Sequence, residues 1–154
     1  MEIVATARER LVLTRDHGSC GIRATARKES LERIGHGVYL RSEDGWKPWE
    51  RARVVNAART IAALADDETA RAGLTSAVVL WGLPLWQFPT TVDILVKQSD
   101  WRRPVSFPAV ISKKKGTEQL RRHAFTLAED DHAVVHDAPT VGLHRLATDV
   151  SLSW

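Results

Sequence analysis

Carboxylates and histidines with metal-ligand chemistry gather near the end of the chain. Glu129, Asp130, Asp131 and His132 are consecutive, and His136 follows four residues later. Carboxylate and imidazole groups bind divalent metals, and a metal-dependent phosphodiesterase needs clustered carboxylates to hold its ion. The spacing here matches no defined metal site. We therefore expect a turn with solvated charges and no bound metal.

Two other pairs contain residue types suited to catalysis. Asp93 and Lys97 are spaced as in a nuclease strand, but the residues between them are apolar where an acidic residue is needed. Cys20 lies three residues after His17, and a surface turn explains this pair equally well. The chain also contains no Gly-rich phosphate loop, no G-x-S-x-G elbow and no H-E-x-x-H motif. We expect a protein that is not an enzyme and that needs no cofactor.

Basic side chains in the first 45 residues are suited to duplex DNA, because Arg and Lys neutralise phosphates and bond base edges. Some of them fall on one short stretch with helical character, and the others fall on or beside a glycine-rich hairpin. The candidate DNA-binding residues are Arg23, Thr25, Arg27, Lys28, Arg33, His36 and Arg41. The alternative interpretation is a small helical cap with a surface hairpin that contacts no nucleic acid.

Charge is unevenly distributed along the 154 residues, although the net charge is only +3. Residues 1–60 carry a net +4 and residues 97–122 a net +6, whereas 61–96 carry −3 and 123–154 carry −4. Such alternation suits a protein that meets a polyanion at one place and folds or pairs elsewhere. The second basic block supplies auxiliary candidates for contact with phosphate or an acidic partner: Arg102, Arg103, Lys113, Lys114, Lys115, Arg121 and Arg122.

Glycines divide the first 45 residues into several short elements. The pattern predicts a helix over residues 3–10 and a second helix that Thr14 can cap through its hydroxyl. Gly21 is expected to make a turn before a third, basic helix over residues 23–31.

A small β-hairpin is predicted next. Residues 32–34 and 38–40 alternate around Gly35-His36-Gly37, which is the pattern of two short strands joined by a tight turn. Three short helices followed by a hairpin is the order of a winged helix-turn-helix. That fold places a helix in the major groove of DNA.

These segments resemble the N-terminal winged helix of the AbiE-type abortive-infection antitoxins. The resemblance rests on Leu11-Val12-Leu13-Thr14-Arg15, on Gly21-Ile22 before the basic helix, and on the hairpin ending in Gly37-Val38-Tyr39. Residues 74–84, LTSAVVLWGLP, are similar to the family's helix of the type S-x-A-A-x-x-x-G-L-P, and residues 92–96 stand where the family has a strand. The resemblance implies the DNA-binding partner of a type IV toxin–antitoxin system.

The resemblance continues more loosely toward the end of the chain. Residues 138–150 look like the family's strand-then-helix segment, with His144-Arg145 in place of its Arg-Thr pair. The span from Thr14 to Gly21 is shorter than the family's usual second helix. We also expect this chain to lack the further C-terminal domain into which relatives usually continue.

The middle of the chain predicts a long helix from Pro48 to about Asp66. Proline is favoured at a first helical position, where its missing N–H costs nothing. Apolar residues such as Val54, Val55 and Ala58 recur at helical spacing, which leaves Glu50, Arg51, Arg53 and Arg59 on the other faces. Strands are expected over residues 91–97, 109–113 and 120–126. The predicted fold class is α+β: a winged helix-turn-helix in residues 1–45, then a small domain in 46–154 with helices packed on a mixed, mainly antiparallel sheet.

The composition and the first residues of the sequence limit the expected cellular location of the protein. A content of 44% hydrophobic and 27% charged residues is that of a folded globular protein. No stretch approaches the roughly 18 apolar residues of a membrane span. Arg8, Glu9 and Arg10 stand where a signal peptide needs apolar residues. We expect a cytoplasmic protein that does not enter the membrane.

The sequence therefore predicts a regulator that binds double-stranded operator DNA and represses a toxin–antitoxin or phage-defence locus. A cognate toxin is a further expected partner, and a homodimer stays open. The first alternative is a protein-interaction module that binds a partner without binding an operator, because its helix-turn-helix is shortened. A metal-dependent nuclease is the third hypothesis.

Overall fold

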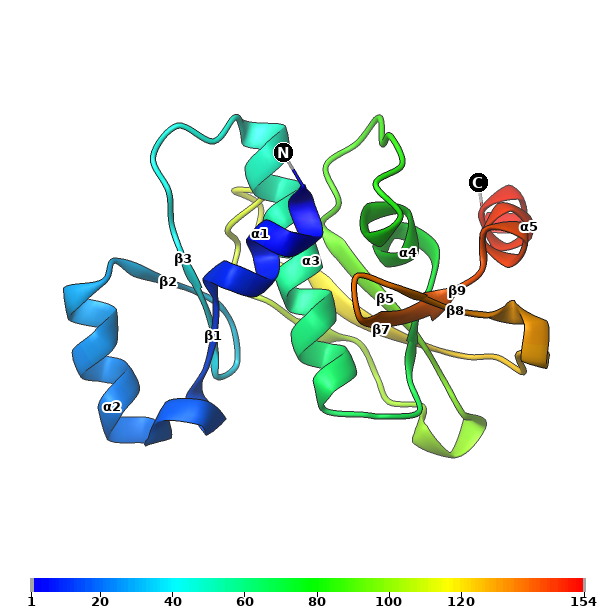
Figure 1. The fold of residues 1–154 in the computed structure, drawn as a ribbon, viewed down its shortest axis with the longest axis horizontal. Helices are drawn as coiled ribbons and strands as arrows, with labels where there is room; N and C mark the ends of the chain where they lie inside the picture. Colours follow the sequence, from blue (N-terminus) through cyan, green and yellow to red (C-terminus); the bar gives the residue numbers. More distant parts are fainter. Residues whose placement is uncertain (1, 154) are drawn as a thin grey trace.

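The chain forms a mixed α+β structure in which one long helix, α3 (Pro48–Ala65), packs between two β-sheets (Figure 1). The structure is a computed structural model that describes residues 2–153, without the side chains of Ser19, Cys20 and Arg23. The helix begins at Pro48 as predicted, and Glu50 Oε2 accepts a hydrogen bond of 2.9 Å from the Lys47 backbone N–H. The remaining elements form one group before α3 and one group after it.

The first group contains a small antiparallel sheet. Its strands have the order β1-β3-β2, with Leu11 opposite Leu40 and Leu31 opposite Arg41. The β2–β3 hairpin was predicted from its glycines and is confirmed. The elements are α1 (Ile3–Arg10), β1 (Leu11–Leu13), α2 (Thr14–Lys28), β2 (Leu31–Gly35) and β3 (Val38–Arg41).

The predicted turn at Gly21 is wrong. Gly21 lies inside α2, and the break between the second and third predicted helices falls at Gly18 instead, with φ 69° and ψ 159°. A positive φ carries no steric penalty in glycine, so the interruption falls there. Thr14 does not cap the helix as predicted. Leu13 occupies the N-cap position, and Thr14 is the first residue of α2.

The second group is built on a six-stranded sheet with the order β6-β7-β5-β4-β9-β8. The β5–β7 and β4–β9 pairs are parallel and the other pairs are antiparallel, so the sheet is mixed as predicted. Its elements are β4 (Arg71–Ala72), α4 (Leu74–Leu80), β5 (Thr91–Val96), η1 (Gln98–Asp100), β6 (Val105–Ser106), β7 (Gln119–Ala124), η2 (Glu129–Asp131), β8 (His132–Val135), β9 (Ala138–Val141) and α5 (Leu143–Ser153).

The predicted strand over residues 109–113 is wrong, because this segment belongs to the loop between β6 and β7. Glu118 Oε1 accepts hydrogen bonds from the backbone N–H groups of Ile111 (2.8 Å) and Ser112 (2.7 Å). A side chain thus satisfies the donors that a neighbouring strand would otherwise have to satisfy.

Helix α3 contributes to the cores of both groups. Val54, Val55 and Ala58 pack in one buried cluster with Ile34 and Leu40 of the hairpin. Its last turns supply Leu64 to a second cluster, which contains residues of α1, α4, β4, β5, β7 and β9. Residues 1–45 and 46–154 therefore share hydrophobic packing through α3, and their division into two domains stays a prediction. Within residues 2–153, none of the helices has the length and apolar character needed to cross a membrane.

Candidate nucleic-acid interface

Helix α2 presents most of its surface to solvent. Among the α2 side chains that the structure describes, only Ile22 is buried, with 3% of its surface exposed. Figure 1 shows α2 at the margin of the molecule, on the far side of the small sheet from α3. Gly21 and Ala24 are exposed, and so are Arg27 and Lys28 in the last turn. Small residues beside cations let a polyanion approach the helix closely.

Both ends of α2 are bonded to the hairpin. Thr14 donates its backbone N–H (2.9 Å) and its hydroxyl (3.2 Å) to the carbonyl oxygen of Gly37. At the other end, Arg41 Nε lies 2.7 Å from Glu29 Oε2, just after the last residue of α2. These bonds link both ends of α2 to the hairpin.

The hairpin turn depends on Gly37. Its φ is 66°, and a Cβ at this position would lie 3.3 Å from the Thr14 hydroxyl oxygen. Glycine therefore permits both the tight turn and the close approach of α2. His36 is exposed at this turn, and the exposed Arg33 donates to the Gly35 carbonyl at 3.2 Å.

The structure places the predicted DNA-binding residues on two elements, α2 and the β2–β3 hairpin. Thr25, Arg27 and Lys28 lie in the second half of α2, and Arg33, His36 and Arg41 lie in or between β2 and β3. The Thr25 hydroxyl bonds the Gly21 carbonyl inside the helix, at 3.0 Å, and Arg41 pairs with Glu29. The side chain of Arg23 lies outside the described residues. Arg27 and Lys28 are exposed cations in the last turn of α2.

The loop that carries the three lysines is anchored beside the hairpin. Val110 and Ile111, at the base of this loop, pack against the cluster that contains Ile34 and Leu40. The tip of the loop is exposed and consists of Lys113, Lys114 and Lys115. The packing of its base connects this auxiliary basic segment with the small sheet.

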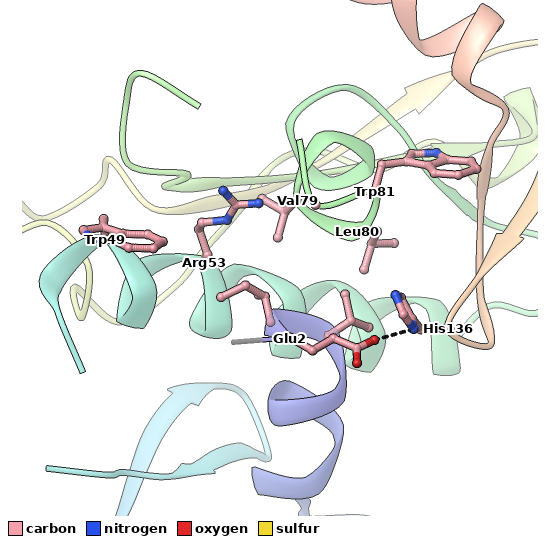
Figure 2. A pocket seen from close by; sticks show the side chains of 10 residues that line it. Glu2, Trp49, Arg53, Val79, Leu80, Trp81 and His136 are labelled. Carbon is pink, nitrogen blue, oxygen red and sulfur yellow. Dashed lines mark ion pairs between the residues drawn. The ribbon is translucent and has the colours of Figure 1, made fainter. Parts of the chain in front are cut away.

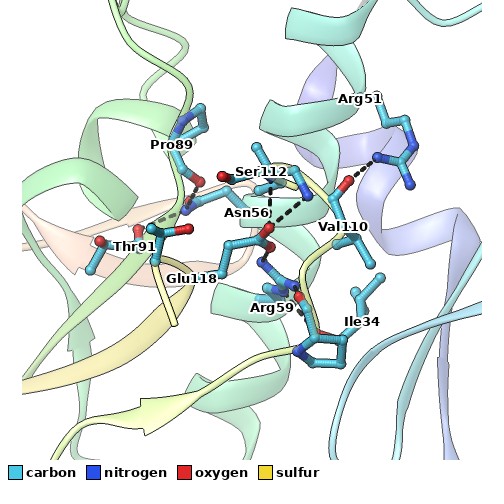
Figure 3. Close-up of polar contacts among 12 residues, drawn as sticks. Ile34, Arg51, Asn56, Arg59, Pro89, Thr91, Val110, Ser112 and Glu118 are labelled. Atoms are coloured by element: carbon cyan, nitrogen blue, oxygen red, sulfur yellow. Dashed lines mark hydrogen bonds and ion pairs between the residues drawn. The ribbon is translucent and has the colours of Figure 1, made fainter. Parts of the chain in front are cut away.

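A buried ion pair holds the hairpin and the loop on α3 (Figure 3). Arg59 Nη1 lies 2.6 Å from Glu118 Oε2, and each of the two side chains is 1% exposed. Arg59 also donates to the carbonyls of Ile34 (2.8 Å) and Pro108 (2.9 Å) and lies over the Phe107 ring. Burial lowers the pKa of the Arg59 guanidinium, while the bond to Glu118 opposes that shift.

The prediction that Arg59 lies away from the apolar face of α3 is wrong. Arg59 follows Val55 by four residues, so it lies one helical turn along the buried face. This spacing was the signal that could have identified it. A second arginine on α3, Arg51, pairs with Glu32 of β2 at 2.5 Å and donates to the Val110 carbonyl.

The other auxiliary basic residues belong to the six-stranded sheet and its connections. Arg102 Nη1 donates to the backbone carbonyls of Ser99 (3.3 Å) and Trp101 (2.9 Å), and Arg103 is exposed beside it. Arg121 is exposed and Arg122 half-buried in β7. These four residues are therefore on different elements from α2 and the hairpin.

The acidic turn near the end of the chain is only partly solvated, which corrects the prediction for Asp131. This carboxylate is buried and accepts a hydrogen bond from the Ala128 N–H at 2.9 Å, and His144 and Arg145 each lie 3.1 Å from it. The Ala128 N–H, His144 and Arg145 together lower the pKa of Asp131, against the opposing effect of burial. Asp131 thus connects η2 to α5.

Among the residues considered for catalysis, Asp93 has a partner in the structure. The buried Asp93 lies 2.8 Å from His123 Nε2 on the neighbouring strand. Among the side chains that the structure describes in residues 2–153, no group of three or more His, Cys, Asp or Glu residues is arranged to hold a metal ion. Comparisons with protein-family models, curated proteins and solved structures find no match to the chain.

Proposed function

We propose that this protein is a DNA-binding transcriptional regulator of the AbiE-type antitoxin kind. The observation that carries the proposal is the element order α1, β1, α2, β2, β3 with the sheet order β1-β3-β2. This order supports a winged helix-turn-helix, in which we take the second half of α2 as the recognition helix and the β2–β3 hairpin as the wing.

The chemistry of the exposed residues supports this use of the fold. Arg27 and Lys28 are exposed on α2, and Arg33 and His36 are exposed on the hairpin. Arginine can form two hydrogen bonds to guanine in the major groove, and every cation can neutralise a phosphate. The α2 helix would read bases while the hairpin contacts the flanking backbone.

The biological setting follows from the family resemblance. A regulator of this kind binds its own operator in the cytoplasm and represses a toxin–antitoxin or phage-defence locus, with a cognate toxin as protein partner. The DNA upstream of the protein's own reading frame is therefore the specific probe to test.

A gel-shift titration with that probe and with a random duplex tests the proposal. The double variant Arg27→Gln with Lys28→Gln should bind the upstream duplex much more weakly, because each specific base contact contributes about 1–3 kcal/mol. Lys97→Gln removes an exposed charge from the residue that follows β5 and serves as the control. Unchanged binding by the double variant would contradict the proposed role of α2.

A protein-interaction module is the second candidate, and an apolar groove favours it. A groove of about 310 Å³ lies between α5 and the segment that follows α4. It is lined by Val78, Pro84, Leu85, Trp86 and Val150. The Trp86 side chain is 77% exposed. If the wild type binds no duplex at low salt, and Trp86→Ser abolishes association with the co-expressed product of a neighbouring gene, this candidate replaces the first.

A further inference from the structure

A cavity of about 270 Å³ lies where α1, α3, α4 and the β8–β9 turn meet (Figure 2). Trp49 and Arg53 of α3 line it together with Val79 and Leu80 of α4, and Glu2 and His136 lie at its other end. Four segments that are distant in sequence therefore contribute to one pocket. The pocket is separate from α2 and from the hairpin.

Arg53 is the unusual residue in this cavity. Its Nε atom is inaccessible to water and has no hydrogen-bond partner among the described residues. Desolvation by burial lowers the pKa of the Arg53 guanidinium. By contrast, Arg51 and Arg59 on the same helix are both paired with carboxylates. An anion in the cavity would pair with the terminal Nη groups of Arg53, because the enclosed Nε atom is closed to a ligand and Arg53 has no hydrogen-bond or ion-pair partner among the described residues.

The remaining walls favour an anion with an apolar body. Trp49 lies on one side of Arg53 in Figure 2, and Val79 and Leu80 lie on the other side. Trp49 is 48% exposed, so its ring can still be covered by a ligand. The Glu2 carboxylate lies 2.8 Å from His136 Nδ1 and is directed away from Arg53. That carboxylate thus leaves the Arg53 end of the cavity open to an anion.

We propose that this cavity binds a small organic carboxylate with a flat apolar body. The guanidinium of Arg53 pairs with the carboxylate, and Trp49, Val79 and Leu80 contact the body. The volume is close to the lower end of ordinary ligand pockets, about 300 Å³, so the ligand is small. This binding site does not depend on the proposed DNA-binding function.

Titration of the full chain with benzoate and indole-3-carboxylate tests the proposal. Two-dimensional NMR of the tryptophan side chains should show saturable shifts that include Trp49. The neutral analogues benzamide and indole should bind at least about tenfold more weakly, because they cannot form a charge-assisted pair with Arg53. Equal affinity for the charged and neutral probes would overturn the assignment of an anion site.

Variants separate Arg53 from the general charge of the protein. Arg53→Gln should weaken carboxylate binding at least about tenfold, whereas Arg103→Gln, on an exposed loop, should leave it unchanged. Arg53→Lys keeps the positive charge, so it can be tested in place of Arg53→Gln if that variant fails to fold. It should bind more weakly than the wild type, because lysine cannot pair through two N–H groups. No saturable shift at millimolar probe concentration, or equal binding by all variants, would overturn the proposal.

Discussion

Arg59 and Glu118 are both buried in the protein interior, where an unpaired charge is unfavourable. The ion pair that they form with each other compensates both charges. The two side chains also form hydrogen bonds with backbone groups of Ile34, Pro108 and Ile111. They therefore join α3, the hairpin and the β6–β7 loop. Removing one partner of a buried pair leaves the other charge uncompensated. The stability of the hairpin therefore depends on residues far from it in sequence.

Glu118→Gln should lower the free energy of unfolding by about 3–5 kcal/mol, because Arg59 stays buried and charged. The control is Glu32→Gln, which breaks the half-exposed pair with Arg51 and should cost about 0–1 kcal/mol. Urea denaturation followed by circular dichroism measures both. Equal losses of unfolding free energy for the two variants would mean that burial does not determine how much the Arg59–Glu118 pair contributes to stability.

Asp131 predicts a dependence of stability on acid. Its pKa in the folded protein is depressed, first by the Ala128 N–H and then by His144 and Arg145. In the unfolded chain its pKa returns to about 3.9, so the unfolded state binds more protons between the two values. The stabilisation is fully present above about pH 3.9 and is lost as the pH falls through the folded value.

Asp131→Asn should therefore be less stable than the wild type at neutral pH and should lose less stability on acidification. Asp130→Asn changes the exposed neighbouring carboxylate and should retain the acid dependence of the wild type. Thermal unfolding between neutral pH and pH about 3 gives the comparison. An Asp131→Asn protein with the full acid dependence would show that other carboxylates are responsible.

At the scale of elements, two glycines near α2 should respond in opposite directions to the same substitution. Gly37 has a φ of 66° and lies against Thr14, so Gly37→Ala should cost roughly 1–2 kcal/mol and disturb the hairpin. Gly21 lies inside α2, where a Cβ would have only His17 at 4.0 Å. Gly21→Ala should stabilise the protein by about 0.4–1 kcal/mol. Thermal unfolding of both variants tests the assignment of Gly21 to the helix rather than to a turn.

The elements with strong local signals were predictable from sequence. Apolar periodicity and Pro48 located α3, and the alternation around Gly35 and Gly37 located the hairpin. The error at Gly21 arose because glycine permits a turn without requiring one, and only three-dimensional context selected Gly18. The false strand over residues 109–113 arose because its backbone donors bond to Glu118, a contact that sequence pattern does not reveal.

The candidate site was predictable only as a set of basic residues. Their positions on α2 and the hairpin follow from local sequence, but the pairing of Arg41 with Glu29 does not. Arg53 and Glu118 were missed for the same physical reason. Whether a charged side chain is paired, buried or exposed depends on residues brought from other parts of the chain.

At the scale of the molecule, α3 connects the proposed DNA-reading elements with the rest of the protein. Arg51 and Arg59 on one side of it bond the hairpin and the β6–β7 loop, and Arg53 lines the cavity. The exposed lysines at the tip of that loop are thus carried by a segment that packs on the hairpin's core. If the protein binds DNA as proposed, α2 and the loop should have different roles.

The lysine loop should contribute phosphate contacts without sequence discrimination. Replacing Lys113, Lys114 and Lys115 by Gln should weaken binding to the upstream duplex and to a random duplex equally. The slope of log affinity against log salt should fall by about 0.9 for each lost contact, because each phosphate contact releases condensed counterions. Arg27→Gln should instead reduce the ratio of specific to random affinity, since α2 is the element proposed to read bases. Fluorescence anisotropy over a range of salt concentrations distinguishes the two effects. If the triple variant binds all duplexes with the wild-type slope but no longer engages a co-expressed toxin, the loop is a protein-recognition element and α2 alone carries the DNA contacts.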